Sequence, residues 1–107
     1  MVSAVDDGVG QLLETLKENN LEQDTLLFFL SDNGGPTTKN ASRNNPLRGN
    51  KGDVWEGGFR VPFAARWPAK FPKGSVYDLP VSSLDIFATI AALSSVKLDE
   101  QRPLDGV

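Results

Sequence analysis

The sequence predicts an α/β fold, namely a partial parallel-type sheet with flanking helices. Three observations support this prediction: an amphipathic helical pattern at the start of the chain, a continuous apolar run soon after it, and a second helical pattern before the C-terminal tail. The composition, with 39% hydrophobic and 23% charged residues in a chain of 107, is typical of a globular protein. An amphipathic helix that leads into an apolar strand is half of an α/β unit.

The first predicted helix ends at Asn19–Asn20, an amide-rich pair that is typical of a helix C-terminus. Gly8 and Gly10 lie inside the helical pattern and cost about 1 kcal/mol each relative to alanine. Their presence predicts that the helix packs closely against a neighbour there. The apolar residues recur at spacings of three and four, on one helical face: Val2, Val5, Val9, Leu12, Leu13 and Leu16.

Two strands are predicted. The apolar run 25–31 is typical of a strand buried on both faces, and therefore of a parallel sheet covered by helices. A polar, turn-rich stretch follows over 32–56, and a loop of this length is usually functional or disordered. Apolar residues return over 59–67, where Pro62 indicates an edge strand, a strand start or a bulge.

The second predicted helix covers 81–93. Ser82 or Ser83 is expected to cap its N-terminus, and Asp85 lies in its first turn, where a negative charge is favourable. The tail over 97–107 is polar, and the chain has no internal repeat.

The composition also excludes several kinds of chemistry. The chain has no cysteine and no histidine, which rules out disulfides, Cys/His zinc sites and histidine-dependent triads built from this chain alone. The net charge of -3 argues against binding to nucleic acid. No apolar run approaches the ~18 residues of a membrane span, and the N-terminus lacks the pattern of a signal peptide.

The first candidate site follows the predicted strand 25–31. Ligands of open α/β sheets bind beyond the carboxyl ends of the strands. Asp32 and Asn33 would offer a carboxylate and an amide oxygen there, and calcium and magnesium prefer such ligands. Both side chains reach one ion only if the backbone turns, which Gly34–Gly35 permits. Taken alone, the same residues favour an ordinary turn over a metal site.

Two further segments carry candidate residues. Lys51 lies in a loop between small residues, where its ammonium group would bind an oxyanion or simply remain solvated. Gly57–Gly58 predicts a close approach of two backbones, and Glu56 and Arg60 are expected to pair across that turn. We interpret this second segment as structural.

Together the segments resemble the sulfatase family of the alkaline phosphatase superfamily, in particular arylsulfatases and N-acetylgalactosamine-6-sulfatases. The resemblance rests on the order of motifs along nearly the whole chain. These motifs are Asp6–Leu13, Ser31–Gly35, Leu47–Gly52, Trp55–Pro62, Arg66–Pro68, Ser83–Ile90 and Leu104–Val107. One departure is Asn50, which stands where the family pattern has glycine.

The resemblance implies hydrolysis of sulfate esters. It implies that Asp32 and Asn33 are ligands of an active-site divalent cation, usually calcium, in the full-length enzyme. It also implies that Lys51 contacts a sulfate oxygen and stabilises charge in the transition state. Glu56, Gly57, Gly58 and Arg60 match a structural turn of the family.

The family's nucleophile is absent. It is a formylglycine made within the pattern [CS]-x-P-x-R, which does not occur here, and the family's active-site histidines are also missing. We therefore expect residues 1–107 to be the later part of an incomplete sulfatase catalytic domain. Such a segment would be inactive alone, would hardly bind the metal alone, and would self-associate through exposed sheet edges.

Three other hypotheses remain open at this stage. The chain could act as a hydrolase with the nucleophile supplied by another chain. It could be a non-enzymatic binding module with a vestigial site. It could also be part of a related phosphodiesterase or phosphatase. The sequence identifies neither the sulfate ester nor the compartment.

Overall fold

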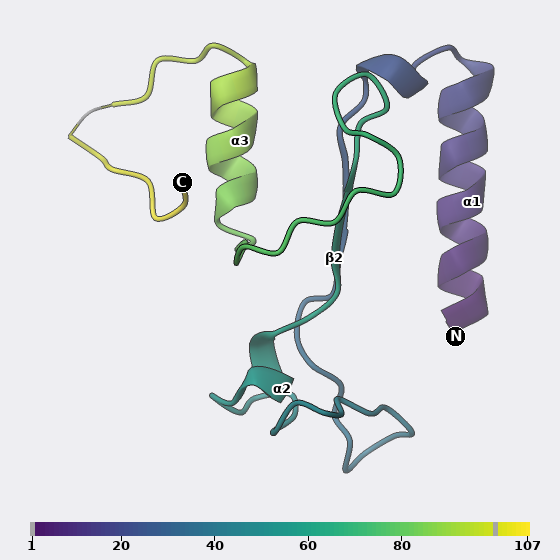
Figure 1. The fold of residues 1–107 in the computed structure, drawn as a ribbon, viewed down its shortest axis with the longest axis vertical. Coiled ribbons are helices and arrows are strands. Elements are labelled where there is room, and N and C mark those ends of the chain that lie inside the picture. Colours follow the sequence, from purple (N-terminus) through teal and green to yellow (C-terminus); the bar gives the residue numbers. More distant parts are fainter. Residues whose placement is uncertain (1, 100) are drawn as a thin grey trace. The chain divides into compact units, whose positions relative to one another are not determined.

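The computed structural model describes residues 2–99 and 101–107 (Figure 1). It contains two compact units, one ending at Ser75 and one beginning at Val76. The first unit holds α1 (Val2–Glu18), the 3-10 helix η1 (Glu22–Asp24), β1 (Leu27–Leu30), α2 (Glu56–Phe59) and β2 (Phe63–Arg66). The second unit holds α3 (Asp85–Leu93). The combination of helices with a small sheet confirms the predicted α/β class.

Helix α1 ends where the asparagine pair predicts. Asn20 has a φ of 56°, a left-handed conformation that asparagine tolerates better than most residues. The N–H of Leu21 donates to the carbonyl of Leu16 at 2.8 Å, and the N–H of Asn20 donates to the carbonyl of Lys17 at 3.1 Å. These two bonds form a Schellman motif, which satisfies carbonyl groups that the helix end would leave free.

The prediction for the two helical glycines is wrong. A Cβ atom built on Gly8 or Gly10 would meet nothing within 4 Å. Both glycines face open space in this chain, so close packing does not explain them. A mid-helix glycine is compatible with the helix because the neighbouring residues supply the apolar face, at a cost in stability.

Strands β1 and β2 pair in an antiparallel manner, with Phe28 opposite Ala65 and Leu30 opposite Phe63. The expectation of parallel pairing is therefore wrong for these two strands. Parallel neighbours need a crossover, usually a helix, whereas residues 31–62 fold back through turns and the four-residue α2. Strand β2 begins directly after Pro62, which agrees with a strand start, one of the three placements that this proline indicates.

The strands are only partly covered. Phe29 is 47% exposed, which contradicts the expectation of a strand buried on both faces. On the other face, the rings of Phe28 and Phe63 contact edge to face, with centroids 6.0 Å apart. Among the described residues, Ala91 of α3 is the one buried apolar residue, with 6% exposure. The chain therefore has little apolar core of its own.

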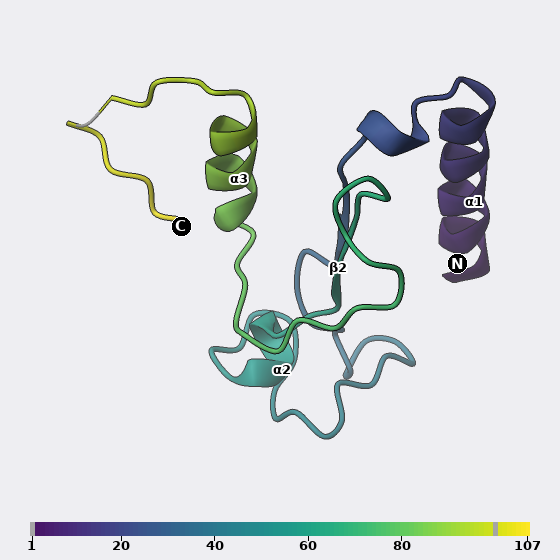
Figure 2. The ribbon, with the colours of Figure 1, turned by 45° about the horizontal axis from the view of Figure 1, so that its top comes forward.

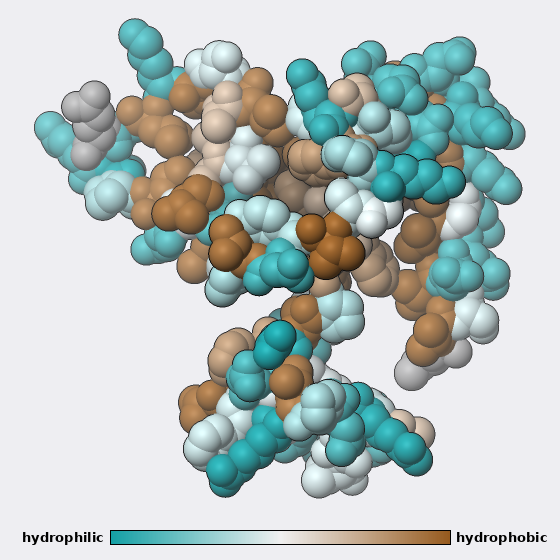
Figure 3. Space-filling model, in the orientation of Figure 1, coloured by the Kyte–Doolittle hydropathy of each residue, from teal (hydrophilic) through white to brown (hydrophobic). Residues whose placement is uncertain are grey.

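Helix α1 lies alongside β2 (Figures 1 and 2). Residues of α1 and of both strands line a shallow apolar groove. Apolar side chains gather along α1 on the same side (Figure 3). We call this feature the α1 groove, and its apolar lining residues are Val2, Val5, Val9, Leu13, Leu27, Phe29, Ala64 and Ala65.

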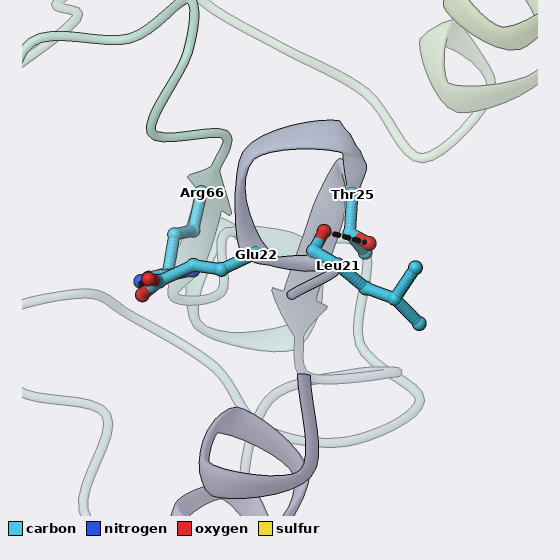
Figure 4. A network of polar contacts seen from close by, with 4 residues as sticks. All are labelled: Leu21, Glu22, Thr25 and Arg66. Carbon is cyan, nitrogen blue, oxygen red and sulfur yellow. Dashed lines mark hydrogen bonds and ion pairs between the residues drawn. The ribbon is translucent and has the colours of Figure 1, made fainter. Parts of the chain in front are cut away.

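Polar contacts tie η1 to the sheet at the far end of this unit. The Arg66 guanidinium pairs with the carboxylate of Glu22, and the hydroxyl of Thr25 donates to the carbonyl of Leu21 at 2.8 Å (Figure 4). The indole N–H of Trp67 donates to the carbonyl of Gln23 at 2.8 Å. The bonds of Arg66 and Trp67 join the end of β2 to η1.

In the second unit, Ser82 and Asp85 close the turn that leads into α3. The Ser82 hydroxyl accepts from the N–H of Leu84 at 3.2 Å, and the Asp85 carboxylate accepts from the N–H of Ser82 at 2.7 Å. The N-cap position of α3 is Leu84, which makes no side-chain cap bond, so the predicted capping of the helix by a serine is wrong. No helix within 2–99 and 101–107 combines the length and the apolar character that a membrane crossing requires.

Candidate functional site

Asp32 and Asn33 lie where the sequence predicts, directly after β1. The backbone bends at both residues. The Ser31 hydroxyl donates to the carbonyl of Asn33 at 2.8 Å, and the Asn33 amide nitrogen donates to the carbonyl of Gly34 at 3.0 Å. The Asp32 carboxylate is exposed, and the amide oxygen of Asn33 makes no hydrogen bond within the described residues.

Gly34 connects this bend to α2. Its N–H donates to the carbonyl of Gly58 at 2.9 Å, and a Cβ atom on Gly34 would collide with the carbonyl of Gly57. Gly57 and Gly58 are both buried, and the N–H of Gly57 donates to the carbonyl of Arg48 at 2.7 Å. The close backbone approach predicted for the glycine pair is therefore confirmed.

Asn44 connects the same bend to the loop that carries Lys51. Its amide oxygen accepts from the N–H of Gly35 at 3.0 Å. Its amide nitrogen donates to the carbonyls of Gly35 and Gly49 at 2.9 and 3.0 Å. One side chain thus joins the segment two residues after Asn33 to the segment two residues before Lys51.

The loop of Lys51 has a defined shape. Gly49 and Gly52 have φ values of 98° and 90°, which side chains with a Cβ rarely adopt. The N–H of Lys51 donates to the carbonyl of Gly35 at 3.4 Å. The side chain of Lys51 is exposed, and its ammonium group makes no ion pair with the described residues.

The side chains around α2 contact one another and stabilise the Lys51 loop. The guanidinium of Arg60 pairs with Glu56 at 3.0 Å, which confirms the predicted ion pair. The guanidinium of Arg48 lies 3.8 Å from the ring centroid of Trp55. The Asp53 carboxylate accepts from the backbone and the side chain of Asn50, at 2.9 and 2.6 Å. Asp53 therefore fixes the residue that departs from the family pattern.

The arrangement brings Asp32, Asn33 and the Lys51 loop to one end of β1. The carboxylate of Asp32 and the amide oxygen of Asn33 lie on one turn. The ammonium group of Lys51 belongs to the loop that is bonded to this turn. Within the described residues, no three acidic side chains gather closely enough to hold a metal ion.

Comparison with known proteins decides the family. A family model described as Sulfatase matches residues 1–96. The chain belongs to the sulfatase family.

Individual sulfatases match almost the whole chain. This chain is 40% identical to the steryl-sulfatase of Homo sapiens over 112 residues, which covers 98% of this chain and 19% of that protein. It is 34% identical to the N-acetylgalactosamine-6-sulfatase of Rattus norvegicus over 109 residues, covering 99% and 21%. The chain spans about a fifth of the length of these relatives.

A solved structure agrees with the fold. The crystal structure of Ps i-CgsB in complex with k-i-k-neocarrahexaose superposes with a TM-score of 0.94 and 50% sequence identity. The superposition covers 100% of this sulfatase chain and 24% of Ps i-CgsB. Together with the family match, it confirms the predicted family and fold class.

Sequence reasoning missed Asn44. It treated Asn44, Asn45 and Pro46 as turn residues, because asparagine and proline dominate turns for local reasons. The three bonds of Asn44 reach residues five and nine positions away. No local pattern in the sequence signals contacts at that distance.

Proposed function

We propose that this chain is a segment of a catalytic domain that hydrolyses sulfuric esters, in which Asp32 and Asn33 bind a divalent cation and Lys51 contacts the sulfate group. The observation that carries the proposal is the bond from the N–H of Lys51 to the carbonyl of Gly35, at 3.4 Å. This bond holds the lysine loop against the segment that continues Asp32–Asn33.

The donor set fits calcium. Carboxylate and amide oxygens are hard ligands, and the Asn33 amide nitrogen already donates to the Gly34 carbonyl, so the amide oxygen remains available. Calcium takes about six to eight oxygen ligands. Two of them from this chain leave the shell incomplete, so the chain alone is expected to bind calcium weakly. When bound, the cation would polarise the oxygens of the sulfate group.

Lys51 supplies a positive charge on a flexible stem. An ammonium group beside a sulfate oxygen stabilises negative charge that develops as the ester bond breaks. The glycines at 49 and 52 shape the loop, while Asp53 holds Asn50 and leaves the lysine free. The chain contains no formylglycine pattern. We therefore propose that it is inactive alone and completes a site whose nucleophile lies elsewhere.

The names of the matching relatives refer to esters of different alcohols: a sterol, an aryl alcohol and N-acetylgalactosamine. The sulfate ester is what these names share. We therefore propose a sulfate ester as the substrate of the complete enzyme. We also propose that this chain self-associates through the free edges of β1 and β2, since each strand has one partner in the two-stranded sheet.

A chimaera tests the proposed activity. This chain would replace its matching segment in the arylsulfatase of Hemicentrotus pulcherrimus, which is 36% identical over 103 residues. We expect hydrolysis of 4-nitrophenyl sulfate, with kcat about 10²–10³ lower after Lys51→Ala because one group that stabilises the transition state is lost. Asp32→Asn should raise the calcium concentration needed for activity.

The matched control is Lys39→Ala, which removes an exposed lysine from the same long loop. It should leave kcat within about twofold, as surface substitutions usually do. A chimaera that folds like its host but hydrolyses nothing would favour the binding-module hypothesis. Equal effects of Lys51→Ala and Lys39→Ala would overturn the role of Lys51.

A further inference from the structure

A second feature of the long loop is a polar cavity of about 460 Å³. We call it the 37–49 cavity after its first and last lining residues. Leu47 is its only large apolar lining residue, and the remaining lining residues are Thr37, Ser42, Arg43, Asn44, Asn45 and Gly49. The polar character of this lining sets it apart from the α1 groove.

Two groups in the cavity lack partners among the described residues. The Ser42 hydroxyl is shielded from solvent and makes no hydrogen bond. The guanidinium of Arg43 is exposed and has no carboxylate within ion-pair distance in the described part of the chain. The Ser42 hydroxyl is closed to a ligand, whereas the Arg43 guanidinium is open to one.

The cavity is fixed to the proposed sulfate site by Asn44. This residue lines the cavity while its side chain bonds to Gly35 and Gly49 at 2.9–3.0 Å. Ser42 packs so closely against Gly35 that a Cβ atom on Gly35 would collide with the Ser42 side chain. The cavity and the turn that carries Asp32, Asn33 and Lys51 therefore share one hydrogen-bonded frame.

We propose that the 37–49 cavity is a subsite for the alcohol part of the substrate, and that it takes a sugar bearing a second anionic group, which Arg43 binds. This inference rests on the proposed sulfatase function. Sugar hydroxyls would pair with the hydroxyl of Thr37 and the amide of Asn45, whereas a steroid or a plain aromatic ring would desolvate these groups without replacing their hydrogen bonds to water. An arginine guanidinium matches the geometry of a sulfate group.

The test uses the ¹⁵N-labelled chain and three probes: glucose 3,6-disulfate, glucose 6-sulfate and estrone 3-sulfate. We expect the disulfate to shift the amide signals of both Lys51 and Arg43, and to bind more tightly than the other two. Arg43→Ala should weaken the disulfate about fivefold or more, the effect of one charge-assisted contact at an exposed site. It should leave glucose 6-sulfate within about twofold.

Lys39→Ala is the control, because it removes the same charge from the same loop outside the cavity lining. Retained dispersion of the amide spectrum shows that each variant is folded. Shifts confined to the Lys51 loop, or equal binding of estrone 3-sulfate, would overturn the subsite while leaving the sulfatase proposal intact. Shifts at the cavity without any at Lys51 would instead contradict the sulfate-contacting lysine.

Discussion

Asn44 and Gly35 exchange two hydrogen bonds: the Asn44 amide oxygen accepts from the N–H of Gly35 at 3.0 Å, and its amide nitrogen donates to the Gly35 carbonyl at 2.9 Å. The same nitrogen also donates to Gly49. This reciprocal pair replaces the contacts that a regular element would provide in a loop of polar residues. It sets the distance between the Asp32–Asn33 turn and the Lys51 loop.

Asn44→Asp should loosen that frame. The substitution keeps the shape but removes both donors and places a carboxylate against two carbonyl groups. We expect a loss of about 1–3 kcal/mol in local stability, read as faster hydrogen exchange at the N–H of Lys51. Asn45→Asp is the matched control, since the Asn45 side chain makes no hydrogen bond in the described residues. Similar exchange rates in the two variants would contradict the role assigned to Asn44.

Gly34→Ala should disrupt the contact between the turn and α2. The new methyl group would overlap the carbonyl of Gly57, and backbone cannot yield as a flexible side chain does. Overpacking of this kind costs about 1–3 kcal/mol and occasionally more. Hydrogen exchange at Gly57, whose N–H donates to Arg48, measures the loss. An unchanged exchange rate at Gly57 would show that the approach is looser than the structure has it.

Gly10→Ala should have the opposite effect. The Cβ would enter open space, and alanine gains about 0.5–1 kcal/mol over glycine inside a helix. Circular dichroism at 222 nm and the thermal midpoint should both rise. Gly8→Ala provides an independent repeat of the same test on the same helix. A fall in either quantity would show that this face of α1 packs against something in solution.

The contrast between these glycines shows what the sequence can predict. The end of α1 before Asn20, the strand start after Pro62 and the pair Glu56–Arg60 all depend on neighbours within a few residues, and local patterns indicate them. Packing around Gly10 depends on distant residues. A glycine in the sequence is compatible both with a close backbone contact and with open space around the Cα atom. Only the structure distinguishes these two environments.

The candidate site shows the same division. The chemistry of Asp32, Asn33 and Lys51 follows from residue type, and their order along the chain identifies the family. Their mutual placement depends on Asn44 and on backbone bonds between distant glycines, which have no periodic pattern. The antiparallel pairing of β1 and β2 was likewise hidden, because a continuous apolar run does not reveal the direction of its partner.

Asp85 should titrate at unusually low pH. The N–H of Ser82 and then the N–H of Val107 donate to its carboxylate, and these bonds lower its pKa from the ordinary aspartate value. Because the pKa of Asp85 is lower in the folded state, its ionised carboxylate stabilises the fold at pH values above the unfolded pKa of about 3.9. This stabilisation is lost as the pH falls through the folded pKa.

A ¹³C titration of the Asp85 carboxyl group measures this effect, with the same residue in the urea-unfolded chain as its reference. We expect the folded midpoint below the unfolded one, and fraying of α3 at the acid end of the titration. Equal midpoints would mean that the turn formed by Ser82 and Asp85 is not populated in solution.

The chain should self-associate at micromolar concentration through the sheet and the α1 groove. Phe29 lines that groove with 47% of its surface exposed, and burying a phenylalanine contributes about 1.5–3 kcal/mol. Phe29→Lys should therefore raise the dissociation constant by about tenfold or more, since 1.4 kcal/mol corresponds to a factor of ten.

Phe59→Lys is the matched control, because Phe59 is 63% exposed on α2 and lies outside the groove lining. Sedimentation velocity over a dilution series gives the comparison. A wild-type chain that sediments as a folded monomer throughout the series would overturn the proposed self-association, and equal shifts in the two variants would exclude the α1 groove as its surface.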